Sequence, residues 1–145
     1  MNAEIERLIA EEDAGWVAFS AMLHRIPPER LEEPGVTGEG WSAKDVMFHV
    51  GAWLAEASRQ LERIREGTYV EPGTSTQVLN DEWFALSRTL DAVTVRVELE
   101  ASRVMARGSL GSLGAPTPLA VGWFEESGAL HYAEHLPSLG RWLGT

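Results

Sequence analysis

The hydrophobic pattern predicts a first helix over residues 5–26. Its apolar positions recur three, four and seven residues apart, which is the spacing of one face of an amphipathic helix. These positions are Ile5, Leu8, Ile9, Trp16, Phe19, Leu23 and Ile26. The helix should end at Pro27 and Pro28, because proline cannot donate a helical hydrogen bond. Residues 29–40 contain one proline and three glycines and are predicted to form a loop.

A second helix is predicted to begin directly after Ser42. Ser42 is suited to cap the helix, Asp45 occupies the position that completes a capping box, and Trp41 can act as a hydrophobic staple. The apolar stripe that follows consists of Val46, Val50, Trp53, Ala57, Leu61 and Ile64. His49 lies on this stripe, so a helical conformation turns its imidazole toward the interior.

A third helical region follows a break at residues 67–73. Its apolar positions have heptad-like spacing and are Leu79, Trp83, Leu86, Leu90, Val93, Val97 and Val104. Residues 93–99 also alternate strictly between apolar and polar, which is typical of a strand. We favour a helix, because the longer stripe runs through this segment and a lone strand would have no partner. A break near residues 87–89, with Thr89 capping a new helix, fits the same pattern.

The last helix is predicted over residues 122–143, after a loop at residues 108–121. One face of this helix carries His131, His135, Leu139 and Trp142. Pro137 should bend it just beyond the two histidines. The uncharged stretch 108–124 is expected either to cover a site and select an apolar ligand, or to pack on the bundle end or in a dimer contact. Four helical regions without a credible sheet predict an all-α, four-helix-bundle fold in a single domain, residues 1–145.

Composition and charge exclude several classes of function. The net charge is −10, from 12 cationic and 22 acidic residues, so nucleic-acid binding is not expected. We find no transmembrane segment and no signal peptide, and we therefore expect a cytoplasmic protein that does not bind membranes. The sequence has no cysteine. Any metal ion must therefore be bound by nitrogen and oxygen ligands.

Three histidines on apolar stripes are the candidate metal ligands. His131 and His135 are separated by one helical turn, which places both imidazoles on one face. His49, from another helix, would complete a three-nitrogen site with an open position for water or substrate, as in catalytic zinc sites. Zinc, nickel, iron and manganese are all compatible with these ligands. The competing interpretation is that each imidazole is a hydrogen-bonded core or surface residue.

Other residues near these histidines allow two interpretations each. Asp45 can orient His49 or simply cap its helix, and Trp53 can line a pocket or pack in the core. Tyr132 and Glu134 are expected to point to other faces of the last helix, away from the histidines. His24 is expected to lie on the surface at the end of the first helix.

Three segments together resemble the DinB/YfiT-like family. They are WSAKDVMFHVGAW, LNDEWFALSRTLDAV and HYAEHLPSLGRWL, and they extend over most of the chain. The resemblance implies a four-helix bundle with a long crossover that places helices two and three parallel, and commonly a homodimer. It also implies a divalent metal ion bound by three histidines, which in this sequence are His49, His131 and His135.

The same resemblance implies two kinds of function. Some relatives are thiol-dependent transferases or isomerases that use a low-molecular-weight thiol such as mycothiol or bacillithiol. The mycothiol-dependent maleylpyruvate isomerase branch normally has a second, C-terminal domain that this sequence lacks. Another branch, the colibactin self-resistance proteins, implies hydrolysis or sequestration of a reactive small molecule. We therefore expect a metal-dependent thiol S-transferase or hydrolase, with a non-catalytic binding or sequestering protein, whose metal is structural or absent, as the alternative.

Overall fold

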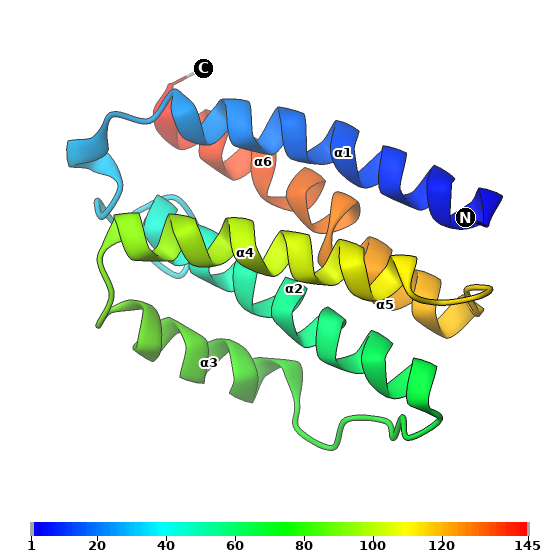
Figure 1. The fold of residues 1–145 in the computed structure, drawn as a ribbon. Coiled ribbons are helices and arrows are strands. Elements are labelled where there is room, and N and C mark those ends of the chain that lie inside the picture. Colours follow the sequence, from blue (N-terminus) through cyan, green and yellow to red (C-terminus); the bar gives the residue numbers. More distant parts are fainter. Residues whose placement is uncertain (1, 145) are drawn as a thin grey trace.

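The computed structural model describes residues 2–144, and all regular secondary structure in this range is helical (Figure 1). The α-helices are α1 (Ala3–His24), α2 (Ala43–Glu66), α3 (Thr76–Ser87), α4 (Ala92–Gly111), α5 (Pro118–Ser127) and α6 (Ala129–Leu143), with a short 3-10 helix, η1 (Pro28–Arg30). The all-α prediction is thus confirmed, including the choice of helix for residues 93–99. Within residues 2–144, none of the helices has the length and apolar character needed to cross a membrane.

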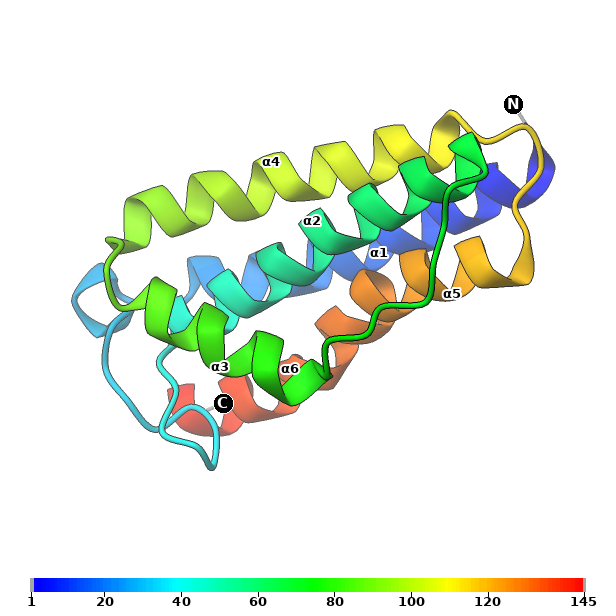
Figure 2. The same ribbon diagram turned by 90° about the horizontal axis from the view of Figure 1, so that it is seen from below.

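The long helices pack side by side in two opposite directions. Helices α2 and α4 lie next to each other and run the same way, whereas α1, α5 and α6 run the opposite way (Figures 1 and 2). Helix α3 lies in the long connection between α2 and α4 and packs on the outside of α2 (Figure 2). This connection lets α4 start at the same end of the molecule as α2, and the two helices are therefore parallel.

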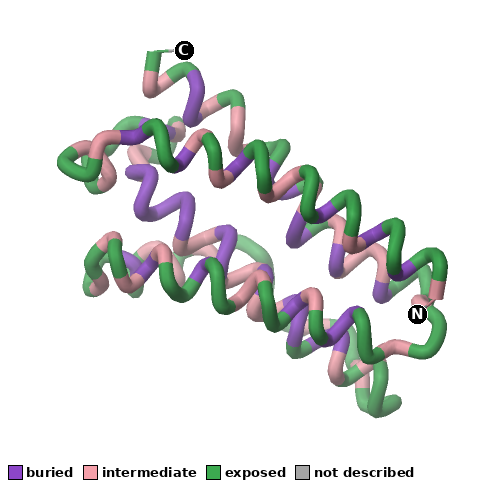
Figure 3. Tube along the Cα trace, turned by 45° about the horizontal axis from the view of Figure 1, so that its top comes forward, coloured by how far each residue is buried: buried purple, intermediate pink, exposed green. Residues whose placement is uncertain are grey.

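Helix α2 is central to the core. It packs against α3, α4, α5 and α6, and its N-terminal turns are almost entirely buried (Figure 3). The largest fully buried apolar side chains come from α1, α2, α4, α5 and α6, and they include Phe19, Leu54, Leu99, Phe124, Tyr132 and Leu139. Burial of such side chains supplies most of the stability of a helical protein. A residue on α2, such as His49, is therefore held by its neighbours on several sides.

The N-terminus of α2 has the predicted capping box. The Ser42 hydroxyl accepts a hydrogen bond from the Asp45 backbone N–H at 3.1 Å, and the Asp45 carboxylate accepts one from the Ser42 backbone N–H at 2.9 Å. Asp45 also accepts a hydrogen bond from the Ser87 hydroxyl at 2.5 Å. Asp45 therefore fastens the start of α2 to the end of α3.

The break that was considered near residues 87–89 is present, and the predicted third region is two helices with different orientations. The chain breaks at residues 88–91, and Asp91, not Thr89 as predicted, caps α4 by accepting a hydrogen bond from the Thr94 backbone at 2.7 Å. The break allows α4 to rotate independently of α3, so the predicted stripe does not continue into the core. Three residues of the predicted stripe are exposed on α4, namely Val93, Val97 and Val104. The residues of α4 that are buried in their place are Val95, Leu99, Ala106 and Leu110.

The predicted loop and last helix also need correction. Helix α4 continues to Gly111 and α5 already begins at Pro118, which leaves only residues 112–117 as loop. Proline is tolerated at the first position of a helix, where its missing N–H would have no partner. The predicted helix 122–143 is divided at Gly128, where an added Cβ would lie 3.0 Å from the Phe124 carbonyl oxygen. Pro137 lies inside α6, which continues to Leu143.

Candidate metal centre

The three predicted histidines converge between α2 and α6. The Nε2 atom of His131 lies 3.0 Å from Nε2 of His49 and 3.0 Å from Nε2 of His135. One ring nitrogen from each of the three lies within 4.8 Å of the others. The fourth histidine, His24, is exposed at the end of α1 and its Nδ1 lies 2.8 Å from the Ser20 carbonyl oxygen, as expected for a surface residue.

Hydrogen bonding among the rings cannot account for this convergence. A neutral imidazole nitrogen carries either one lone pair or one hydrogen, so Nε2 of His131 can form a hydrogen bond to only one of its two neighbours. The other contact then brings polar atoms together without a hydrogen between them. A cation between the rings would satisfy all three lone pairs at once, and these residues therefore fit a metal ion.

Burial keeps the three imidazoles neutral at physiological pH. Burial is the main cause that lowers the pKa of His131 to about 3, and the nearby rings of His49 and His135 add to the effect, while a weak backbone interaction with Ser127 opposes it. The pKa of His49 is lowered to about 4, again chiefly by burial. Burial also lowers the pKa of His135, against the opposing charges of Glu134 and Glu39. Neutral imidazole is the form that binds metals.

The Nδ1 atoms of two of the three rings lack hydrogen-bond partners in the described residues. Nδ1 of His49 and Nδ1 of His131 are buried and have no hydrogen bond of normal geometry among the described residues. Asn80 of α3 is close enough to His49 to oppose the lowering of the His49 pKa, and Asn80 Oδ1 accepts a hydrogen bond from Trp53 Nε1 at 3.1 Å.

The Asp45 carboxylate accepts hydrogen bonds from Ser42 and Ser87. Of the two roles considered for Asp45, the structure therefore shows helix capping.

A buried ion network fixes the orientation of α6. Glu12 of α1 is 1% exposed and binds Arg103 and Arg107 of α4 at 2.6–2.9 Å. The Tyr132 hydroxyl donates a hydrogen bond to Glu12 at 2.8 Å. Burial and the Glu12 carboxylate raise the pKa of Tyr132, which therefore remains a hydrogen-bond donor. Tyr132 thus points away from the histidines, as predicted, and its bond to α1 keeps His131 and His135 turned toward α2.

The sequence analysis missed this network, although one of its residues carries a local signal. Its members come from α1, α4 and α6, and Glu12 is 91 and 95 positions from its two arginines. Glu12 occupies a position on the apolar stripe of α1, three residues after Ile9 and four before Trp16, and a carboxylate on a buried stripe requires a partner. The partners of Glu12, however, follow only from the packing of the helices.

A cleft of about 620 Å³ opens onto two of the three histidines. It lies between α2, the connection to α3, the start of α3, α5 and the beginning of α6. Its lining includes His49, Trp53, Tyr69, Glu71, Asn80, Leu119, Trp123, Glu126, His131 and Glu134. Trp53 thus lines a pocket, and Glu134, which was predicted to face away, lines the same cleft. From the uncharged stretch 108–124, residues 118, 119, 122 and 123 line it as part of α5.

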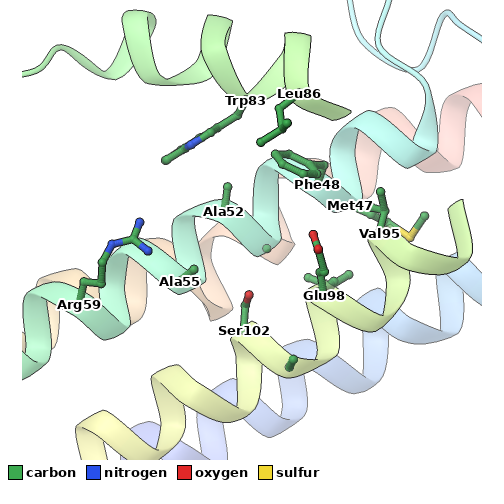
Figure 4. A pocket seen from close by; sticks show the side chains of 13 residues that line it. Met47, Phe48, Ala52, Ala55, Arg59, Trp83, Leu86, Val95, Glu98 and Ser102 are labelled. Atoms are coloured by element: carbon green, nitrogen blue, oxygen red, sulfur yellow. The ribbon is translucent and has the colours of Figure 1, made fainter. Parts of the chain in front are cut away.

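A second, smaller groove contains none of the three histidines. It has a volume of about 290 Å³ and lies between α2, α3 and α4. Figure 4 shows Trp83 and Leu86 of α3 and Val95, Glu98 and Ser102 of α4 around Phe48, Ala52 and Ala55 of α2. Because it is lined mainly by apolar side chains, the groove offers no cluster of metal ligands. Of these two hollows, only the larger cleft is therefore a candidate site for metal chemistry.

Comparison with known proteins supports the fold alone. No protein-family model and no curated protein matches the sequence. The chain is similar in structure to an uncharacterised protein from Escherichia coli UTI89, with a TM-score of 0.79 and 16% sequence identity over 95% of this chain and 91% of that chain. At this identity the likeness carries no information on function.

Proposed function

We propose that the protein is a DinB-like four-helix bundle that binds one divalent metal ion through His49, His131 and His135. The four helices of the bundle would be α1, α2, α4 and the interrupted helix α5–α6. In support, α2 and α4 are parallel and are joined by the long connection that contains α3 (Figure 2). This connection supports the crossover that the family resemblance implies between the second and third helices of the bundle.

The observation that carries the metal proposal is the pair of 3.0 Å contacts at Nε2 of His131. Metal–nitrogen distances of about 2.0–2.1 Å in a tetrahedral site place neighbouring nitrogens roughly 3.3 Å apart. The two contacts are near this separation, so small side-chain shifts would suffice to bind an ion. Zinc, nickel, iron and manganese all accept imidazole ligands, and the choice among them is open.

The proposed reaction is metal-dependent attack by a small thiol or by water on an electrophilic small molecule. Bound at the three histidines, a divalent ion supplies Lewis acidity that lowers the pKa of a thiol or water toward neutrality. The chain has no cysteine, so a thiol of the mycothiol or bacillithiol class must be brought in as a second substrate. Glu126 and Glu134 line the cleft and are available to accept the proton that this nucleophile loses.

The alternative function is binding or sequestration of a reactive small molecule without turnover. One observation favours it: the cleft of about 620 Å³ is large enough to enclose an entire small molecule. In that case the metal ion would be structural or absent, and the histidines would only contribute to the walls of the cleft.

We also propose a homodimer formed through α4. An apolar row on the outer face of this helix consists of Val93, Val97, Val104 and Met105, which are 49–76% exposed. Exposed apolar rows of this kind often mark protein interfaces. Light scattering should show twice the monomer mass for the wild-type protein. Val97→Glu should reduce this to the mass of a monomer without loss of helical content. A monomeric wild-type protein would contradict this interface.

A conjugation assay distinguishes the transferase or hydrolase from the sequestering protein. Zinc-loaded, untagged protein would be mixed with mycothiol, bacillithiol or buffer and a generic electrophile such as monobromobimane. We expect turnover above the metal-free rate, loss of that turnover in His131→Ala, and no change in His24→Ala, which alters a histidine outside the site. Stoichiometric binding of the electrophile without turnover would favour sequestration and contradict the enzymatic proposal.

A further inference from the structure

We propose that the cleft beside the three histidines selects small molecules that carry a positively charged nitrogen on an apolar body. The inference deepens the proposed function, because it takes this cleft as the ligand site and names the class of molecule that the site admits. It rests on the charges and the aromatic side chains of the lining and on the buried histidine at its base.

The charges that line the cleft are all negative. They belong to Glu56, Glu71, Glu126 and Glu134, and the lining contains no lysine or arginine. Only Glu56 is neutralised, by Arg59. In the described part of the chain the other three carboxylates form no ion pair. Three uncompensated negative charges exceed the two positive charges of a divalent ion, so the loaded site would still attract a cation.

Aromatic side chains supply the second part of the recognition. Trp53, Tyr69 and Trp123 line the same cleft. Trp53 Nε1 donates to Asn80, Trp123 Nε1 donates to the Tyr69 hydroxyl at 3.2 Å, and that hydroxyl donates to Glu71 at 3.1 Å. These bonds occupy the polar atoms and fix the rings. Fixed aromatic rings next to carboxylates are a favourable environment for an ammonium group.

The acidic lining belongs to a ligand site because of the histidine at its base. His131 lines the cleft, is 6% exposed, and has a buried Nδ1 without a hydrogen-bond partner in the described residues. A buried polar atom left in this state costs stability and is therefore more typical of a functional site than of a structural core. The smaller groove provides the contrast, because its charged lining consists of one arginine, Arg59, and one glutamate, Glu98. The excess of negative charge is therefore a property of the cleft.

The test compares three probes that share a benzyl body. Benzyltrimethylammonium is positive and cannot coordinate a metal, benzyl alcohol is neutral, and benzylsulfonate is negative. Isothermal titration calorimetry with zinc-loaded protein should show the cation binding about tenfold tighter than the alcohol. The sulfonate should bind more weakly than either. The preference for the cation should shrink as the salt concentration rises, because salt screens exposed carboxylates.

Two double variants locate the effect. Glu126→Gln combined with Glu134→Gln should reduce the affinity for the cation about three- to tenfold and leave that for the alcohol unchanged. Glu29→Gln combined with Glu98→Gln is the matched control, since both residues are exposed and without an ion pair in the described residues, and it should change neither affinity. The zinc content of each variant would be measured in parallel to confirm that the metal site is intact.

The outcomes separate this inference from the metal proposal. Equal affinity for all three probes, tighter binding of the sulfonate, or no binding at millimolar concentration would overturn the inference even if zinc binds normally. A clear preference for the cation in protein that binds no zinc would support the inference and contradict the metal proposal. An equal loss of cation affinity in both double variants would also overturn it, because the effect would then come from net charge alone.

Discussion

The Nε2 atoms of His49 and His131 lie 3.0 Å apart, although the two residues are 82 positions apart in the sequence. Helix α2 supplies one ring and helix α6 the other, and both rings are held by packing on several sides. His135, one turn after His131, brings its Nε2 within 3.0 Å of the same atom. The arrangement therefore depends on how two distant helices are oriented, and the predictions below test both the site and the packing that orients it.

The metal-free protein should lose stability as the pH falls below about 6.5. In the unfolded chain, histidine has its ordinary pKa of about 6.5, whereas the pKa is about 4 for His49 and about 3 for His131 in the folded protein. Between these values the unfolded state binds more protons, so the free energy of unfolding decreases by up to about 1.4 kcal/mol per pH unit for each histidine. Urea denaturation between pH 7 and pH 5 measures this slope.

The slope should be smaller in His49→Gln combined with His131→Gln, and unchanged in His24→Gln. The pH range stays above 5 because lowered carboxyl pKa values, such as those of Glu56 and Glu62, add their own dependence at lower pH. A wild-type stability that is constant from pH 7 to pH 5 would contradict the burial of neutral imidazoles.

Substitutions in the network around Glu12 should lower the free energy of unfolding far more than a substitution of the neighbouring residue Glu11. Glu12→Gln leaves Arg103 and Arg107 without their buried carboxylate and should lower the free energy of unfolding by about 3–5 kcal/mol. Tyr132→Phe removes one hydrogen bond to that charge and should cost about 1–3 kcal/mol. Glu11→Gln, at an exposed ion pair with Arg7, should have no measurable effect.

Chemical denaturation of the three variants gives these values directly. Tyr132→Phe should in addition weaken zinc binding, because Tyr132 holds the helix that carries His131 and His135. Unchanged zinc affinity in a clearly destabilised Tyr132→Phe protein would show that the network stabilises the fold without orienting the site.

Two glycine substitutions test the close packing of α2 on α4. An added Cβ at Gly51 would lie 3.2 Å from the Leu99 Cα, so Gly51→Ala should push the helices apart and cost about 1–3 kcal/mol. Gly108 lies in α4 with no atom within 4 Å of an added Cβ, and Gly108→Ala should stabilise the protein by about 0.5–1 kcal/mol. Thermal unfolding of both variants checks the opposite signs. Equal effects would contradict the close approach of these helices.

Local patterns in the sequence predicted much of the fold and the three histidines. The first two helices, the capping box at Ser42 and the common face of His131 and His135 follow from spacing within one helix. The convergence of His49 with that pair was inferred from apolar stripes and from the family resemblance, and the structure places the rings together.

Features that depend on the relation between helices were not predicted. The face of α4 was assigned incorrectly because the break at residues 88–91 resets its orientation, which turns Val93 and Val97 outward. Gly128 divides the last helix because its φ of −107° and ψ of −108° are not helical, and a side chain there would lie 3.0 Å from the Phe124 carbonyl oxygen. Glu134 was expected to face away, yet it lines the cleft because it follows His131 by three residues and is its neighbour on the helix surface. The face that α4 turns to the core, in contrast, is decided by long-range packing.

X-ray absorption spectroscopy of the zinc-loaded protein is the most direct test of the central claim. We predict a first shell of light atoms at about 2.0–2.1 Å with the multiple scattering of three imidazoles, and one zinc per chain. His131→Ala should lose that signature, whereas His24→Ala should keep it. A spectrum with oxygen ligands only, or equal zinc content in wild type and His131→Ala, would contradict the three-histidine site.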